Sequence, residues 1–106
     1  MAILRYLELK YILNKYNFCN KVRINIKNNG HFFDYIIIAT CSSEKHIYST
    51  TLDFISILKS RYSISSSVEG LLYKRWVIIN LQNYSINFFL QNEIKKYKIY
   101  SLYKKK

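Results

Sequence analysis

The sequence predicts a small α+β (α/β) domain in which three helices flank a mixed sheet of about five strands. An apolar run at residues 36–39 lacks polar alternation, which favours a strand covered on both faces. After a small polar break, apolar residues recur at helical spacing, so a helix should follow directly. Alternating and aromatic-rich segments on either side supply the remaining strands.

The 106 residues form one domain, 1–106, because a chain of this length builds a single core. The apolar share of 50% favours a globular fold. No apolar run approaches the roughly 18–20 residues of a membrane span, and the N-terminus lacks a signal-peptide pattern. Cys19 and Cys41 share no spacing motif, which indicates free thiols and a cytoplasmic protein.

The first half of the chain predicts a helix and a hairpin. A helix is expected over residues 3–16, with its apolar positions toward the core. These positions are Ile3, Leu4, Leu7, Tyr11 and Leu13. Residues 22–27 alternate strictly, as in a strand with one wet face. Turn-forming residues at 28–30 then predict an antiparallel hairpin with the buried strand.

The second half predicts two helices and three strands. A helix over 43–61 should be capped by Ser42 or Ser43. A short edge strand is expected at 63–68, and strands at 75–80 and 84–90 should be joined by a tight turn. A last helix over 93–103 places Glu93 near its N-terminus and lysines near its C-terminus, the order that the helix dipole favours.

The formal net charge of +11 allows two interpretations. It is typical of a nucleic-acid partner. The abundance of Lys, Asn, Ile and Tyr, all encoded by A/T-rich codons, supports compositional drift equally well.

Catalytic and metal sites are not expected, so the sequence predicts a protein without cofactors that is not an enzyme. Only His31 and His46 could serve a hydrolase triad, and neither lies in a nucleophile motif. The cysteines and histidines lack zinc-ligand spacing, and two glycines cannot build a phosphate-binding loop. The six acids form no close pair on one strand, which argues against two-metal nucleotidyl transfer.

Four polar or aromatic residues allow both structural and functional interpretations. Asp34 either caps the hairpin turn or shapes the entrance to the following helix. Lys45 and His46 oppose the dipole at a helix start, so a partner contact is one explanation for them. Trp76 is the sole tryptophan, and it is either a core plug or an interface residue.

Two segments match a known family. The run D-Y-I-I-I-A-T at 34–40, with Ser43 and His46 after it, resembles a signature block of the ribosomal silencing factor (Iojap) family. V-E-G at 68–70, followed by W-V-I-I at 76–79, is similar to that family's second block. Tyr97, Ile99, Leu102 and Tyr103 resemble its closing helix, so the resemblance covers nearly the whole chain.

The resemblance implies a nucleotidyltransferase-like fold without catalytic acids. It implies a translation repressor that binds the large ribosomal subunit, through its protein numbered fourteen, and sterically blocks joining of the small subunit. The protein would act as a monomer on the ribosome, and a homodimer of the free protein stays open. By position, the implied contact residue is Trp76, followed by Glu69, Gly70, Lys45 and His46. The alternative function is a basic RNA-binding or large-subunit assembly module.

Several positions depart from the family pattern. Cys41 replaces a glycine, Asn87 replaces a histidine, and Asn80 and Asn83 stand where acids are usual. Tyr103 replaces the closing tryptophan. Fewer acids would weaken complementarity to a basic ribosomal protein, whereas added lysines favour contacts with ribosomal RNA phosphates.

Overall fold

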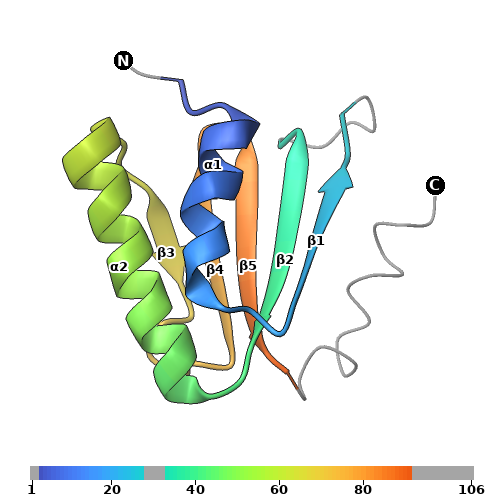
Figure 1. Cartoon of the computed structure of the whole chain (residues 1–106), viewed down its shortest axis with the longest axis vertical. Coiled ribbons are helices and arrows are strands. Elements are labelled where there is room, and N and C mark those ends of the chain that lie inside the picture. The colour runs from blue at the N-terminus through green and yellow to red at the C-terminus, as the bar shows by residue number, and fades with distance from the viewer. Residues whose placement is uncertain (1–2, 28–32, 92–106) are drawn as a thin grey trace.

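Two helices lie on one face of a five-stranded mixed sheet (Figure 1). The computed structural model describes residues 3–27 and 33–91. The elements are α1 (Tyr6–Leu13), the 3₁₀ turn η1 (Asn14–Tyr16), β1 (Asn20–Asn25), β2 (Tyr35–Cys41), α2 (Glu44–Tyr62), β3 (Ser67–Glu69), β4 (Trp76–Leu81) and β5 (Tyr84–Leu90).

The strand order is β1-β2-β5-β4-β3. β1 and β2 form the predicted antiparallel hairpin, and β4 and β5 form a second one through a two-residue turn. β2 and β5 are parallel neighbours, with Tyr35 opposite Tyr84 and Cys41 opposite Leu90. A parallel pair needs a long crossover, and here the crossover contains α2, β3 and β4. The predicted edge strand is present, but it begins at Ser67 rather than at residue 63.

The first helix is shorter than predicted and faces the core differently. It begins at Tyr6, and its last residues tighten into η1. The prediction that Ile3, Leu7 and Tyr11 face the core was wrong, because all three are exposed. The buried side of α1 is formed by Leu9, Ile12 and Leu13.

Local chemistry sets both ends of α2. The Ser43 hydroxyl accepts a hydrogen bond from the backbone N–H of His46 at 3.0 Å, which makes Ser43 the N-cap. At the other end Ser63 adopts a left-handed conformation with φ of 56°. The N–H of Ile64 then bonds the carbonyl of Leu58, and this bond closes the helix.

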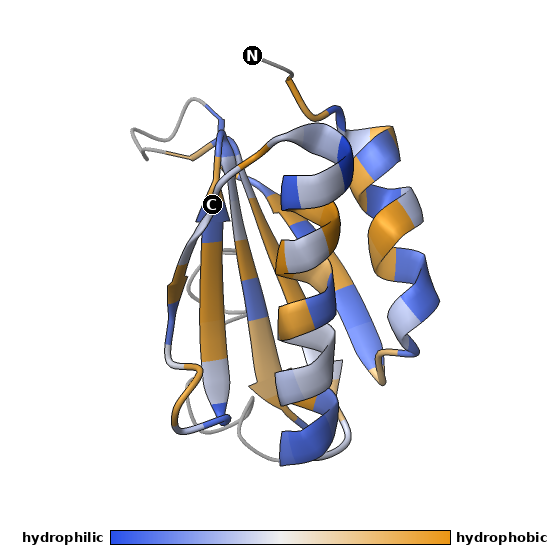
Figure 2. Cartoon of the chain, turned by 90° about the vertical axis from the view of Figure 1, so that its left-hand side faces the viewer, coloured by the Kyte–Doolittle hydropathy of each residue, from blue (hydrophilic) through white to orange (hydrophobic). Residues whose placement is uncertain are grey.

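The sheet has apolar residues on both faces (Figure 2). Ile37 and Phe88 pack toward α1 and α2, against Phe54 and Leu58. On the outer face, opposite the helices, Ile36, Ile38 and Phe89 cluster with residues of β1 and with Trp76. The prediction that residues 36–39 form a strand covered on both faces is confirmed, since all four are buried.

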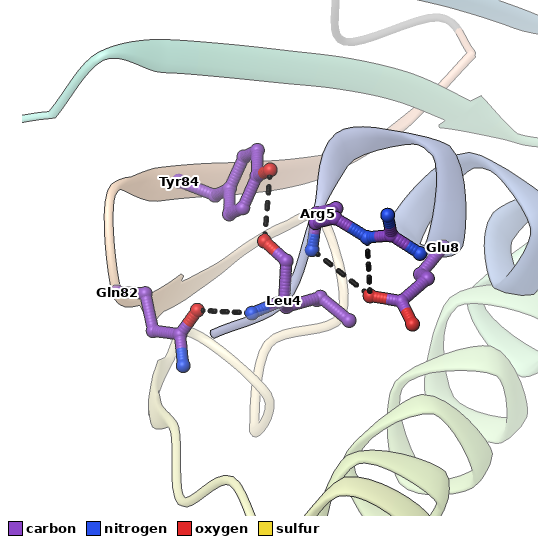
Figure 3. A network of polar contacts seen from close by, with 5 residues as sticks. All are labelled: Leu4, Arg5, Glu8, Gln82 and Tyr84. Carbon is purple, nitrogen blue, oxygen red and sulfur yellow. Dashed lines mark hydrogen bonds and ion pairs between the residues drawn. The ribbon is translucent and has the colours of Figure 1, made fainter. Parts of the chain in front are cut away.

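The segment before α1 is fastened to the β4–β5 turn (Figure 3). The backbone N–H of Leu4 donates to the side-chain oxygen of Gln82 at 2.8 Å, and its carbonyl accepts from the Tyr84 hydroxyl at 3.1 Å. Glu8 accepts from the backbone N–H of Arg5 at 3.1 Å. These bonds hold α1 against the sheet at the chain's first described residues.

The predicted turn at 28–30 and the predicted helix at 93–103 lie outside the described residues. Within the described ranges, neither helix is long and apolar enough to cross a membrane. Cys19 is exposed and Cys41 is buried, and both are free thiols, as expected.

Candidate partner-binding site

All five predicted contact residues lie at one end of the sheet, at the bottom of Figure 1, where α2 and β4 begin and β3 ends. They lie on two sides of it. Lys45 and His46 belong to the helix layer, whereas the side chains of Glu69 and Trp76 point to the outer face, because they alternate with Val68 and Val77 of the helix-facing core.

Trp76 is half-buried, so neither a pure core role nor a free surface position describes it. Its ring stacks on Phe89 with ring centres 4.7 Å apart and an interplanar angle of 26°. Its Nε1–H donates to Oδ1 of Asn87 at 2.9 Å. The Asn87 amide nitrogen in turn donates to the Ser85 carbonyl at 3.3 Å. The indole is therefore held in place before any partner arrives.

Gly70 shapes the approach to Trp76 through its backbone. Its φ is +88°, and a Cβ on it would lie 2.2 Å from the carbonyl oxygen of Trp76. Only glycine fits such a position. Its own carbonyl accepts bonds from the N–H groups of Tyr73 and Lys74, both at 3.2 Å. Glu69, directly before it, is exposed at the sheet edge.

Lys45 and His46 differ in their exposure and in the contacts that they make within the fold. Lys45 is exposed. The His46 ring accepts from the backbone N–H of Ser42 at Nδ1 (3.1 Å), so its Nε2–H donates to the carbonyl of Tyr16 at 2.7 Å. The ring also stacks on Phe18. Both ring nitrogens of His46 are thus used within the fold: Nδ1 binds the turn before α2, and Nε2–H joins α2 to the segment before β1.

The sequence analysis missed a group of exposed apolar side chains in the β3–β4 loop, which leads into Trp76, and on α2. Leu72 and Tyr73, in the β3–β4 loop, are 81% and 74% exposed. Tyr48 and Leu52 are exposed one turn apart on α2, and the Lys74 ammonium lies 5.1 Å from the centre of the Tyr48 ring. Clustered exposed apolar side chains with a polar rim are typical of protein-binding surfaces. The signal was present in the sequence as L-L-Y-K at 71–74, but only the loop geometry shows which of these residues are exposed.

Of the structural and functional roles considered for Asp34, its contacts support the structural one. Its carboxylate accepts from the Asn83 side-chain amide at 3.0 Å, and its backbone N–H donates to the Asn83 carbonyl at 2.9 Å. Asn83, a departure from the family pattern, thereby joins the start of β2 to the β4–β5 turn.

The replacement of glycine by Cys41 fits the backbone, because Cys41 is not among the described residues with positive φ. Burial raises the pKa of its thiol to about 12, which disfavours the reactive thiolate at neutral pH. In the described ranges, no three His, Cys, Asp or Glu side chains lie close enough to hold a metal ion. The candidate partner-binding site therefore rests on this end of the sheet and on the anchored indole of Trp76.

The fold and this surface define a small α+β protein with a candidate partner-binding end. The sequence model of the RsfS family, "Ribosomal silencing factor during starvation", matches residues 8–106. The chain therefore belongs to the ribosomal silencing factor family, and the resemblance seen in the sequence is confirmed. This is a regulatory, ribosome-associated family.

Two solved structures share the fold. A crystal structure from Chromobacterium violaceum superposes with a TM-score of 0.83 at 16% identity, covering 94% of this chain and 87% of that one. One from Bacillus halodurans gives 0.78 at 22% identity, with 92% and 94% covered. These identities show the fold alone, and they confirm the predicted α+β class.

A curated relative matches over a shorter stretch. The mitochondrial ATPase synthesis protein 25 of Clavispora lusitaniae is 39% identical over 46 residues, which are 43% of this chain and 8% of that protein. The match therefore spans only a small part of the relative's length.

Proposed function

We propose that this protein binds the large ribosomal subunit and blocks joining of the small subunit by occupying its joining face, so that translation is repressed. The observation that carries the proposal is the family match across residues 8–106. The ribosomal partner is the large-subunit protein numbered fourteen. The protein acts in the cytoplasm, in keeping with its free cysteines.

The contact surface in this proposal is centred on Trp76. Large aromatic side chains held in place by neighbouring packing are the most frequent hot spots of protein interfaces. Trp76 meets that description through Phe89 and Asn87. Glu69 supplies an exposed negative charge for a basic ribosomal protein, and Lys45 a positive charge for ribosomal RNA phosphates. Gly70 and His46 act by holding the loop and the start of α2 in place.

Co-sedimentation with isolated ribosomal subunits tests the proposal. The protein is expected to migrate with the large subunit and to reduce formation of joined ribosomes when the small subunit is added. Migration with the small subunit alone would contradict it. The rival function, a general basic RNA-binding module, predicts equal binding to unrelated structured RNAs and a steep loss of all binding with salt.

Trp76→Ala should weaken large-subunit binding by about 2 kcal/mol or more, as truncation of a central interface aromatic does. Leu7→Ala is the matched control, because Leu7 is an exposed apolar side chain on α1, on the other side of the sheet. Trp76→Phe, which keeps the stacking on Phe89, should lose less. Equal affinity of the folded Trp76→Ala variant would place the contact elsewhere.

A further inference from the structure

A groove separates α1 from α2 on the helix side of the sheet, on the face opposite the Trp76 ring. Its volume is about 480 Å³, within the ~300–1,000 Å³ range of small-molecule sites. Polar, charged and aromatic side chains line most of it. The lining residues used below are Tyr11, Asn14, Lys15, Arg61 and Tyr62.

The charged groups of the groove are mainly cationic. Arg61 is exposed and takes part in neither of the two ion pairs among the described residues. Nζ of Lys15 lies 3.2 Å from the carboxylate of Asp53, which Arg61 also attracts. Two cations against one shared carboxylate leave a positive charge at the groove.

The positive charge continues past Asn14. Nζ of Lys21 donates to Oδ1 of Asn14 at 2.6 Å, and Lys21 lines a second hollow of about 180 Å³ that shares Asn14 with the groove. Burial, and then the neighbouring charge of Lys10, lower the pKa of Lys21. An anion in the second hollow would relieve this repulsion between like charges.

Aromatic rings from both helices line the groove. Tyr11 projects from α1 and is 77% exposed, whereas Tyr62 is half-buried against the core at the end of α2. Most of the Tyr11 ring is therefore available to a ligand in the groove. Rings beside cations are the combination that single-stranded nucleic acids use, because bases stack on the rings and phosphates pair with the cations.

We propose that this groove binds one unpaired nucleotide of single-stranded RNA, with its base on Tyr11 and Tyr62 and its phosphate on Arg61 and Lys15. The neighbouring phosphate of the strand lies toward Lys21, past Asn14. The site is independent of the Trp76 surface, so RNA and a protein partner can be bound at once.

Fluorescence anisotropy with 5′-labelled hexauridylate and hexaadenylate measures this binding on the full chain. Arg61→Ala and Tyr11→Ala should each weaken binding about tenfold, the loss expected for one phosphate contact or one stacked base. Lys59→Ala is the matched control for charge, because Lys59 is an exposed cation on α2 that does not line the groove. Tyr73→Ala is the matched control for an exposed tyrosine. Both controls should bind as the unchanged protein does.

Three results would overturn the proposal: no binding of either oligonucleotide, an equal loss in Lys59→Ala and Arg61→Ala, or competition by inorganic pyrophosphate as strong as by unlabelled hexauridylate. Tyr11→Phe, which keeps the ring, should bind normally, and a tenfold loss there would also contradict it. Failure of this proposal can be told apart from failure of the ribosome proposal. The ribosome proposal is tested with ribosomal subunits and Trp76→Ala, whereas the RNA groove is tested with short RNA and Arg61→Ala.

Discussion

Gly70 shows how a single residue fixes the shape of the candidate site. The loop after β3 turns back so closely that the Trp76 carbonyl oxygen occupies the space of a side chain at position 70. Gly70→Ala should therefore lower the free energy of unfolding by about 2 kcal/mol or more. Urea denaturation measures this loss.

Leu72→Ala is the control for Gly70→Ala in the same loop. Leu72 is exposed, so its truncation should leave the urea midpoint unchanged. Equal stability of the Gly70→Ala variant and the unchanged protein would show that the loop can shift away from the added methyl group.

Asn87 carries a second residue-scale prediction, because it holds the only indole of the chain. Asn87→Leu removes the acceptor of Trp76 Nε1–H, so the ring should loosen and its fluorescence emission should shift to longer wavelength. Large-subunit affinity should fall by about 1 kcal/mol, the net value of one hydrogen bond.

Asn87→His is the matched variant for this experiment. It introduces the residue that the family pattern has there and keeps a hydrogen-bond acceptor, so the emission should stay close to that of the unchanged protein. An unshifted spectrum in Asn87→Leu would show that stacking on Phe89 alone fixes the ring.

The sequence predicted which residues gather at this end but not how they are used. The family pattern alone placed Trp76, Glu69 and Lys45 together. The bond from Trp76 to Asn87 could not be predicted, because it depends on the register between β4 and β5. The bond from His46 Nε2–H to the Tyr16 carbonyl depends on the path of the chain through Tyr16, which no local pattern specifies.

Among the helices, α1 shows where periodicity fails. Its apolar residues occupy more than one stripe, and the exposed Leu7 is as hydrophobic as the buried Leu9 and Leu13. The spacing of the apolar residues is then compatible with two orientations of the helix about its own axis. The bonds from Leu4 to Gln82 and Tyr84 favour the observed rotation, and these contacts are nearly 80 residues apart along the chain.

The link between η1 and α2 makes a prediction about pH. The Tyr16 hydroxyl donates to the Asp53 carboxylate at 2.7 Å, and this bond, together with Lys15, holds the pKa of Asp53 below its usual value of 3.8. Because the folded pKa is the lower one, the carboxylate stabilises the fold above pH 3.8, and this contribution fades as pH falls through the folded pKa.

Asp53→Asn should accordingly lower the Tm at pH 7 and make progressively less difference as the solution is acidified below about pH 4. Thermal melts of both proteins across this range check the sign. A Tm gap for Asp53→Asn that is the same at pH 7 and pH 3 would contradict the assignment.

For the molecule as a whole, the sequence predicted which segments form strands, but it did not predict the order of those strands in the sheet. The alternation in β1 and the apolar run in β2 are local signals. That β5 lies between β2 and β4, parallel to one and antiparallel to the other, is set by pairings between segments far apart in the sequence. Local patterns contain no information on such pairings.

The central position of β5 affects when the domain can fold during its synthesis. β5 is the last of the described strands to be synthesised, yet both β2 and β4 pair with it, and Leu4 is held by Tyr84 at its start. Until Leu90 has been made, the nascent chain holds the β1–β2 hairpin and α2 without the strand that joins them. Pairings between distant segments also form slowly. The domain must therefore fold almost entirely after translation of its strands is complete, which leaves its apolar segments dependent on protection until that moment.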